Sequence, residues 1–110
     1  MTALHLAAEV GNKETAAILL GNGADVNEGM ALYGTGFQRK FYACRTPLHW
    51  AAANGYNALV ELLIKHGAQV NALNSTFRTP LQEAIMLRRT DVVETLLKNG
   101  AMVNLKDVEG

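Results

Sequence analysis

Two short patterns recur along this chain at a nearly constant spacing, and this repetition limits its fold more than any other feature. The first pattern reads TALHLAA, TPLHWAA and TPLQEAI and begins at three threonines, Thr2, Thr46 and Thr79. The second, Gly-Ala-x-Val-Asn, ends at three asparagines, Asn27, Asn71 and Asn104. In both patterns the last two copies lie 33 residues apart and the first two lie 44 apart, so 11 residues are inserted once. Such a period is typical of repeat proteins, in which each unit buries its apolar faces against its neighbours.

Each unit is predicted to contain two short helices. Thr46 is a good N-cap, and Pro47 suits the first helical position because its missing N–H would be unpaired there. Gly55 permits a tight turn between the helices, and Gly67 stands where a left-handed C-terminal cap belongs. The second helices are expected to bury one apolar stripe per unit, formed by Ile18 and Leu19, by Leu59, Leu62 and Leu63, and by Val92 and Leu96.

The 33-residue period together with Thr-Pro-Leu-His-x-Ala and Gly-Ala-x-Val-Asn resembles ankyrin repeats. The resemblance implies an all-α fold, an α-solenoid of antiparallel helix pairs with β-turn fingers along one edge. We expect a single ankyrin-repeat domain over 1–110, with units at about 2–27, 46–73 and 74–106 and a long finger insertion at 28–45. Members of this family mostly bind other proteins through the finger tips and the surface of the first helices.

The third unit departs from the family pattern at several positions. Gln82 replaces the motif histidine, and Glu83 replaces an apolar residue. Arg88 and Phe77 stand where the family usually has glycine. An arginine at a position that favours positive φ predicts either a remodelled turn or strain on the order of 1 kcal/mol.

The long finger is the strongest candidate for binding a partner. It carries four of the seven aromatic residues and a local excess of positive charge, and these are side chains enriched at binding hot spots. Its candidate contact residues are Tyr33, Phe37, Arg39, Lys40, Phe41 and Tyr42. Two alternatives stay open: the aromatic side chains could cover the solenoid's own edge, or they could stack on single-stranded nucleic acid.

The resemblance adds a second group of candidates, at the ends of the first helices and in the next finger. They are Asn54, Ser75, Thr76, Phe77, Arg78, Met86 and Leu87. Met86, Leu87 and Phe77 could form an adaptable apolar patch. The alternative is that Met86 and Leu87 belong to the core.

Composition excludes several classes of protein. Ten basic and ten acidic residues give zero formal charge, which argues against a general nucleic-acid binder. With 49% apolar and 18% charged residues the chain should fold, and no apolar run reaches the ~18 residues of a membrane span. Cys44 is the single cysteine, and no secretory signal is read, so we expect a cytoplasmic or nuclear protein.

No residue pattern indicates catalysis, a metal or a cofactor. The spacing of His5, Cys44, His49 and His66 matches no compact zinc pattern. His5 and His49 are explained by the repeat motif, in which the imidazole bonds with the motif threonine. We therefore expect neither an enzyme nor a cofactor-binding protein.

The sequence thus favours a protein–protein interaction module that uses its concave face and the long finger. A recruiting or inhibitory subunit of a larger enzyme assembly, and a nucleic-acid-binding module using the basic finger, are the alternatives. We expect a monomer, with end-to-end stacking through uncapped terminal repeats as the other arrangement. Asn27 is a candidate for asparaginyl hydroxylation, because Leu19 and Asp25 precede it at the favoured spacings, although its role in the turn is the stronger interpretation.

Overall fold

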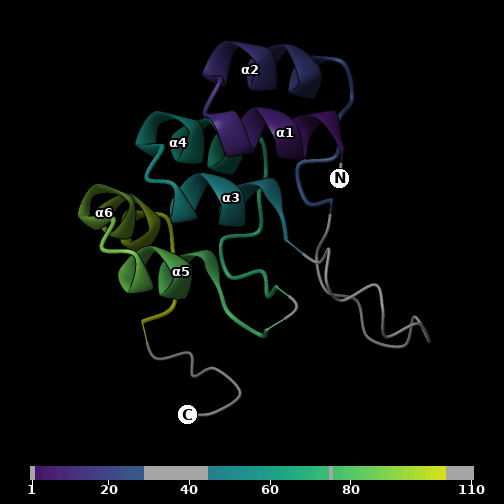
Figure 1. The fold of residues 1–110 in the computed structure, drawn as a ribbon. Helices are drawn as coiled ribbons and strands as arrows, with labels where there is room; N and C mark the ends of the chain where they lie inside the picture. The colour runs from purple at the N-terminus through teal and green to yellow at the C-terminus, as the bar shows by residue number, and fades with distance from the viewer. Residues whose placement is uncertain (1, 29–44, 75, 104–110) are drawn as a thin grey trace, which may run out of the picture.

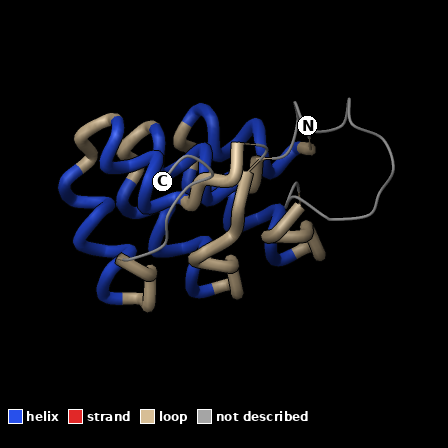
Figure 2. Tube along the Cα trace, turned by 90° about the horizontal axis from the view of Figure 1, so that it is seen from below, coloured by secondary structure: helices blue, strands red, loops and turns tan. Residues whose placement is uncertain are grey.

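The helices of this protein pair up and stack in two layers. The computed structural model describes residues 2–28, 45–74 and 76–103, which form helices and connecting turns without strands (Figure 2). The six helices are α1 (Ala3–Val10), α2 (Lys13–Gly21), α3 (Pro47–Ala53), α4 (Asn57–Lys65), α5 (Pro80–Met86) and α6 (Thr90–Lys98). Helices α1, α3 and α5 pack side by side in one layer, and α2, α4 and α6 pack in the other (Figure 1). This arrangement confirms the predicted all-α solenoid of helix pairs.

The first helix of each pair begins with a reciprocal cap, as the threonine motif predicts. Thr46 Oγ1 accepts a hydrogen bond from the backbone N–H of His49 at 3.2 Å, and His49 Nδ1 accepts one from the Thr46 N–H at 3.3 Å. The same capping box forms between Thr2 and His5 and, with a glutamine in the histidine's place, at Thr79. These bonds satisfy N–H groups that the first turn of a helix leaves without partners.

A left-handed residue ends the turn between the two helices of each pair. Gly11 and Gly55 have φ of 79° and 75°, and Arg88 occupies the equivalent position with φ of 61°. The turn of the third unit is therefore not remodelled. Arg88 keeps the geometry that glycine adopts freely, at a conformational cost on the order of 1 kcal/mol.

The core lies between successive units and between the two layers. Small side chains let the first helices approach closely, and Ala8, Ala51, Ala52 and Ala84 have no exposed surface. The stripes of the second and third units are buried as predicted at four positions, Leu59, Leu63, Val92 and Leu96.

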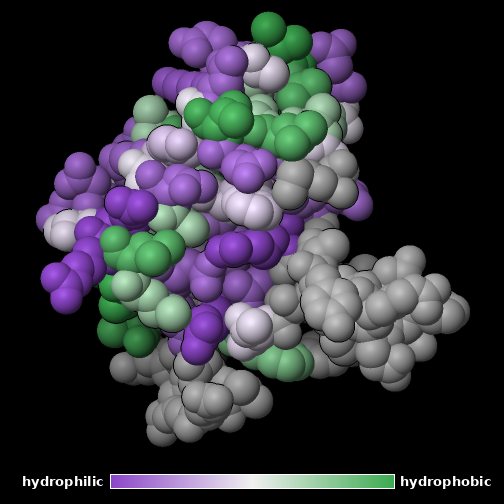
Figure 3. All heavy atoms as spheres, in the orientation of Figure 1, coloured by the Kyte–Doolittle hydropathy of each residue, from purple (hydrophilic) through white to green (hydrophobic). Residues whose placement is uncertain are grey.

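The predicted stripe of the first unit is wrong at one position. Ile18 is 64% exposed, whereas Leu62 and Thr95, which stand at the equivalent place in the later units, are half-buried and buried. Helices α4 and α6 each pack against the second helix of the preceding unit, and no such helix precedes α2 among the described residues. Figure 3 accordingly shows apolar side chains over α1 and α2 at one end of the stack and over α5 and α6 at the other. Within the described part of the chain no helix is long and apolar enough to cross a bilayer.

Candidate protein-binding surface

The inner face is the exposed side of α1, α3 and α5 together with the described turn that leads into α5. At the end of α5, Met86 and Leu87 are 56% and 49% exposed. The interpretation of these two residues as core is therefore wrong. Asn54, at the end of α3, is half-buried and donates from its side-chain amide to the Trp50 carbonyl at 3.0 Å. The inner face thus offers apolar side chains at the third unit and a polar one at the second.

The turn before α5 is held by an asparagine that the sequence reasoning did not single out. Asn74 is buried, and its Oδ1 accepts hydrogen bonds from the backbone N–H of Thr76 at 2.9 Å and of Arg78 at 3.0 Å. The Asn74 N–H also donates to the Arg78 carbonyl at 3.0 Å. Phe77 lies within this turn with φ of 61°, and 38% of its surface is exposed. Of the finger candidates 75–78, Ser75 lies outside the described residues, and the other three occupy this ordered turn.

A charged and aromatic cluster ties the second and third units together across the inner face. The Arg45 guanidinium forms an ion pair with Glu83 and lies 4.8 Å from the centre of the Trp50 ring. Glu83 is buried, so this carboxylate depends on the arginine for compensation. Arg45, which the sequence analysis counted in the positive charge of the finger, is therefore neutralised within the fold.

Glu83 departs from the repeat motif, but the sequence pattern did not predict its ion pair with Arg45. The available signal was complementary charge: the arginine precedes one motif threonine, and the glutamate stands four residues after the next. The two residues belong to neighbouring units, so they come close together only once the units are stacked.

The motif histidines bond to the next unit in addition to capping their own helices. His5 Nε2 donates to the Arg45 carbonyl at 2.6 Å, and His49 Nε2 donates to the Arg78 carbonyl at 2.9 Å. Burial lowers the pKa of His49 from 6.5 to about 4, and the nearby Arg45 charge acts in the same direction. These contacts confirm the structural role predicted for both histidines. The described residues contain no group of three or more histidine, cysteine or acidic side chains that could hold a metal ion.

The hairpin asparagines join neighbouring units in the same way. Asn27 Oδ1 accepts from the Gln69 N–H at 2.8 Å, and its Nδ2 donates to the Gly67 carbonyl at 3.2 Å. Asn71 repeats both bonds with Met102 and Gly100 at 2.9 and 3.4 Å. Asn27, the candidate for hydroxylation, therefore uses both ends of its amide in the inter-unit turn.

The remaining candidates belong to the long finger and lie outside the described residues, which leave out 29–44. They are Tyr33, Phe37, Arg39, Lys40, Phe41 and Tyr42. Their role in binding stays a prediction.

Comparison with protein families finds ankyrin repeats along the chain, in agreement with its stacked helix pairs. The family described as "Ankyrin repeats (3 copies)" matches residues 30–107, and the one described as "Ankyrin repeat" matches residues 1–29. The chain belongs to the ankyrin-repeat family. Ankyrin repeats generally mediate protein–protein interaction and are typically non-catalytic, which agrees with the interaction module expected from the sequence.

Two curated relatives are similar to this chain over part of their length. Rabankyrin-5 from Homo sapiens is 35% identical over 85 residues, which cover 76% of this chain and 7% of the human protein. The E3 ubiquitin-protein ligase XBAT33 from Arabidopsis thaliana is 44% identical over 50 residues, which cover 46% of this chain and 9% of the plant protein. The chain therefore spans less than a tenth of the length of either relative.

Proposed function

We propose that this chain is a protein-binding module whose partner contacts the inner face and the long finger at 28–45. The observation that carries the proposal is the exposure of Met86 and Leu87 at the end of α5. About half of each residue's surface stays exposed in the fold, and burial under a partner would remove that surface from water. Methionine is flexible, so this part of the face could adapt to the shape of what binds.

The rest of the inner face supports a preorganised surface. The Arg45–Glu83 ion pair fixes the second unit to the third, and Asn74 fixes the turn that carries Phe77. A surface that is already ordered loses little conformational entropy when a partner binds, which favours affinity. The long finger, which directly precedes the second unit in the sequence, supplies further aromatic and basic side chains of the types enriched at binding hot spots.

A more specific version is that the module recruits a partner to a larger enzyme assembly. The name of the Arabidopsis relative, an E3 ubiquitin-protein ligase, is the observation in favour of this version. It would require catalytic residues elsewhere in such an assembly.

The test uses affinity capture from a cell extract with the full chain, followed by measurement of binding to each captured protein after purification. Met86→Ser with Leu87→Ser should weaken binding by about tenfold or more, because two buried apolar side chains are lost. The matched control is Ile18→Ser with Leu97→Ser, which removes two exposed apolar side chains from the second-helix layer. If the control weakens binding as much as the test variant, the inner face is not the binding surface.

The finger is tested separately by deleting residues 30–43. None of the helices in the described part of the chain includes these residues, so circular dichroism should show nearly unchanged helical signal. Affinity for the purified partner should fall. Unchanged affinity would remove the finger from the proposal and leave the inner face alone.

A further inference from the structure

The turn between the two helices of a unit is a seat for a side chain from the following unit. The Tyr56 ring lies against Gly11 so closely that a Cβ atom there would come within 2.8 Å of it. Arg89, at the equivalent place in the third unit, lies against Gly55, where a Cβ atom would be 3.1 Å from its Cδ. Arg89 Nε also donates to the Ala53 carbonyl at 2.9 Å. The first two seats are therefore filled from within the fold.

The third seat is built from different residues. Arg88 replaces the glycine, and Ile85 stands where Ala8 and Ala52 are completely buried under the next unit. In a further ankyrin unit stacked in the same geometry, the residue equivalent to Tyr56 and Arg89 would contact the Arg88 Cβ. The first helix of that unit would pack onto Ile85. The third seat therefore differs in shape from the first two.

What lies at this seat is a cleft of ≈ 320 Å³ on the α5–α6 end of the stack. Its lining residues are Ile85, Arg88, Arg89, Thr90 and Val93. Ile85 and Val93 provide apolar walls, and Arg88 provides the positive charge, because the Arg89 side chain lies in the second seat. None of the described lining residues is acidic. The cleft is therefore complementary to an apolar side chain next to a negative charge.

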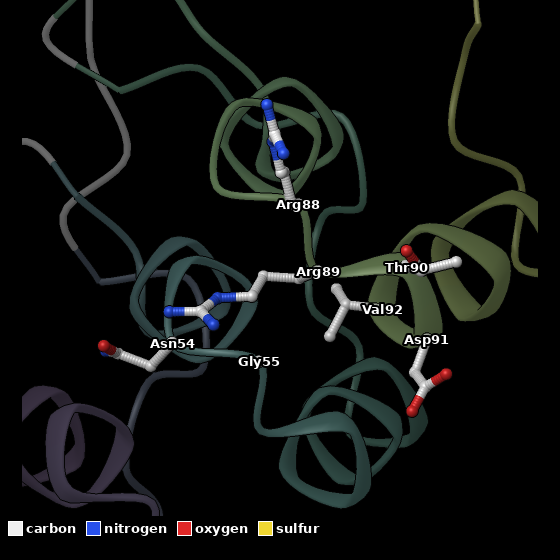
Figure 4. Close-up of a pocket in the computed structure, with 7 residues that line it drawn as sticks. All are labelled: Asn54, Gly55, Arg88, Arg89, Thr90, Asp91 and Val92. Atoms are coloured by element: carbon white, nitrogen blue, oxygen red, sulfur yellow. The ribbon is translucent and has the colours of Figure 1, made fainter.

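Arg88 is the residue whose conformation and exposure indicate a binding site. Its backbone is in the left-handed region, which disfavours every residue with a Cβ atom. Its side chain is exposed, and its guanidinium makes no hydrogen bond or ion pair with the described residues. Figure 4 shows Arg89 reaching toward Asn54 and Gly55, while Arg88 points away from them. Arg88 therefore carries a strained backbone and contributes no polar contact to the described fold, and such strain is typical of functional positions.

We propose that this cleft binds a linear acidic segment of a partner protein. An apolar side chain of that segment enters between Ile85 and Val93, and a neighbouring carboxylate pairs with Arg88. A guanidinium can bind a carboxylate through two parallel hydrogen bonds, which gives direction as well as attraction. This surface is separate from the inner face, so it goes beyond the function proposed above.

The decisive variant is Arg88→Gly, which restores the residue of the other two units. Because glycine adopts positive φ without strain, the variant should unfold at a higher temperature than the unaltered chain. The same change removes the guanidinium, so affinity for an acidic segment should fall about 10- to 100-fold. A merely structural role for Arg88 would not combine higher stability with weaker binding.

The probe is a displayed library of random linear dodecapeptides selected on the full chain, with enriched peptides measured by fluorescence anisotropy. We expect enriched peptides to place Leu, Ile, Phe or Tyr within a few residues of Asp or Glu. Their affinity should fall with Arg88→Gly and with Ile85→Ser, and it should be retained by Lys65→Ala, which removes an exposed cation from α4. Deleting residues 30–43 should also leave it unchanged, so this proposal and the proposed function can fail separately. The proposal is overturned if no such peptides are enriched, or if they bind Arg88→Gly as tightly as the unaltered chain.

Discussion

The buried histidine His49 should make the stability of this protein depend on pH between about 7 and 4. In the fold its pKa is about 4, because burial penalises the charged imidazolium, while the unfolded value is about 6.5. Between these two values the unfolded chain binds more protons than the folded one. The stabilising contribution is therefore present above pH 6.5, falls as the pH drops through this window, and is lost below about pH 4.

The size of the effect follows from the two pKa values. Between pH 7 and pH 5 the free energy of unfolding should fall by about 2 kcal/mol through His49 alone. Protonation must also break the cap, because Nδ1 accepts hydrogen bonds from the Thr46 N–H and the imidazolium cannot accept them.

The chain itself supplies the matched variant, His49→Gln. In the third unit Gln82 performs the same capping, since its Oε1 accepts from the Thr79 N–H at 2.8 Å and its own N–H donates to Thr79 Oγ1 at 3.2 Å. The variant should keep the capping box and lose the bond from Nε2 to the Arg78 carbonyl, which would lower stability at pH 7 by about 1 kcal/mol. The two stability curves should then cross at about pH 5.7, where the free energy lost through His49 reaches about 1 kcal/mol.

The measurement is urea unfolding followed by circular dichroism at closely spaced pH values between 7 and 4.5. Other titrating groups are common to both chains, so the difference between the curves isolates His49. If both chains lose the same free energy between pH 7 and pH 5, His49 does not titrate as its burial implies and the reasoning is refuted.

Two further predictions concern the turns. Gly11→Ala places a Cβ atom 2.8 Å from the Tyr56 ring at φ of 79°, whereas Gly23→Ala meets nothing within 4 Å at φ of 93°. Urea unfolding should show a loss of about 1 kcal/mol for Gly23→Ala and about 1–3 kcal/mol more for Gly11→Ala, and equal losses would contradict the close contact. Asn74→Ala removes the acceptor of the turn before α5 and should cost about 2 kcal/mol in the same assay, with a loss below about 0.5 kcal/mol counting against that role.

Much of the fold could be predicted from the sequence because each unit is specified locally. A threonine followed by proline caps and starts a helix, and a glycine at positive φ ends the turn, through contacts among residues at most a few positions apart. The 33-residue period then repeats the same unit, so neighbours must stack in equivalent ways. The structural roles of His5 and His49 followed from the same motif, and the inter-unit bonds of Asn27 agree with its expected role in the turn.

The candidate site could be predicted only in part. The sequence placed Met86 and Leu87 at the end of a first helix but left open whether they are core, because an apolar residue near a helix end has the same pattern in either case. Exposure depends on what packs over that end, and this is a property of the assembled stack. The same reason explains Ile18, which has the pattern of a buried residue but no helix of a preceding unit against it among the described residues.

The sequence by itself determined the units, their caps and their order, since these rest on short-range spacing. Only the tertiary structure decided which side chains from different units meet, as Arg45, Trp50 and Glu83 do, and as Tyr56 and Gly11 do. It also decided that Arg88 keeps a left-handed backbone beside an open cleft. The physical reason is that the repeat pattern fixes the geometry of stacking, whereas contacts and exposure depend on which side chains that stacking brings together.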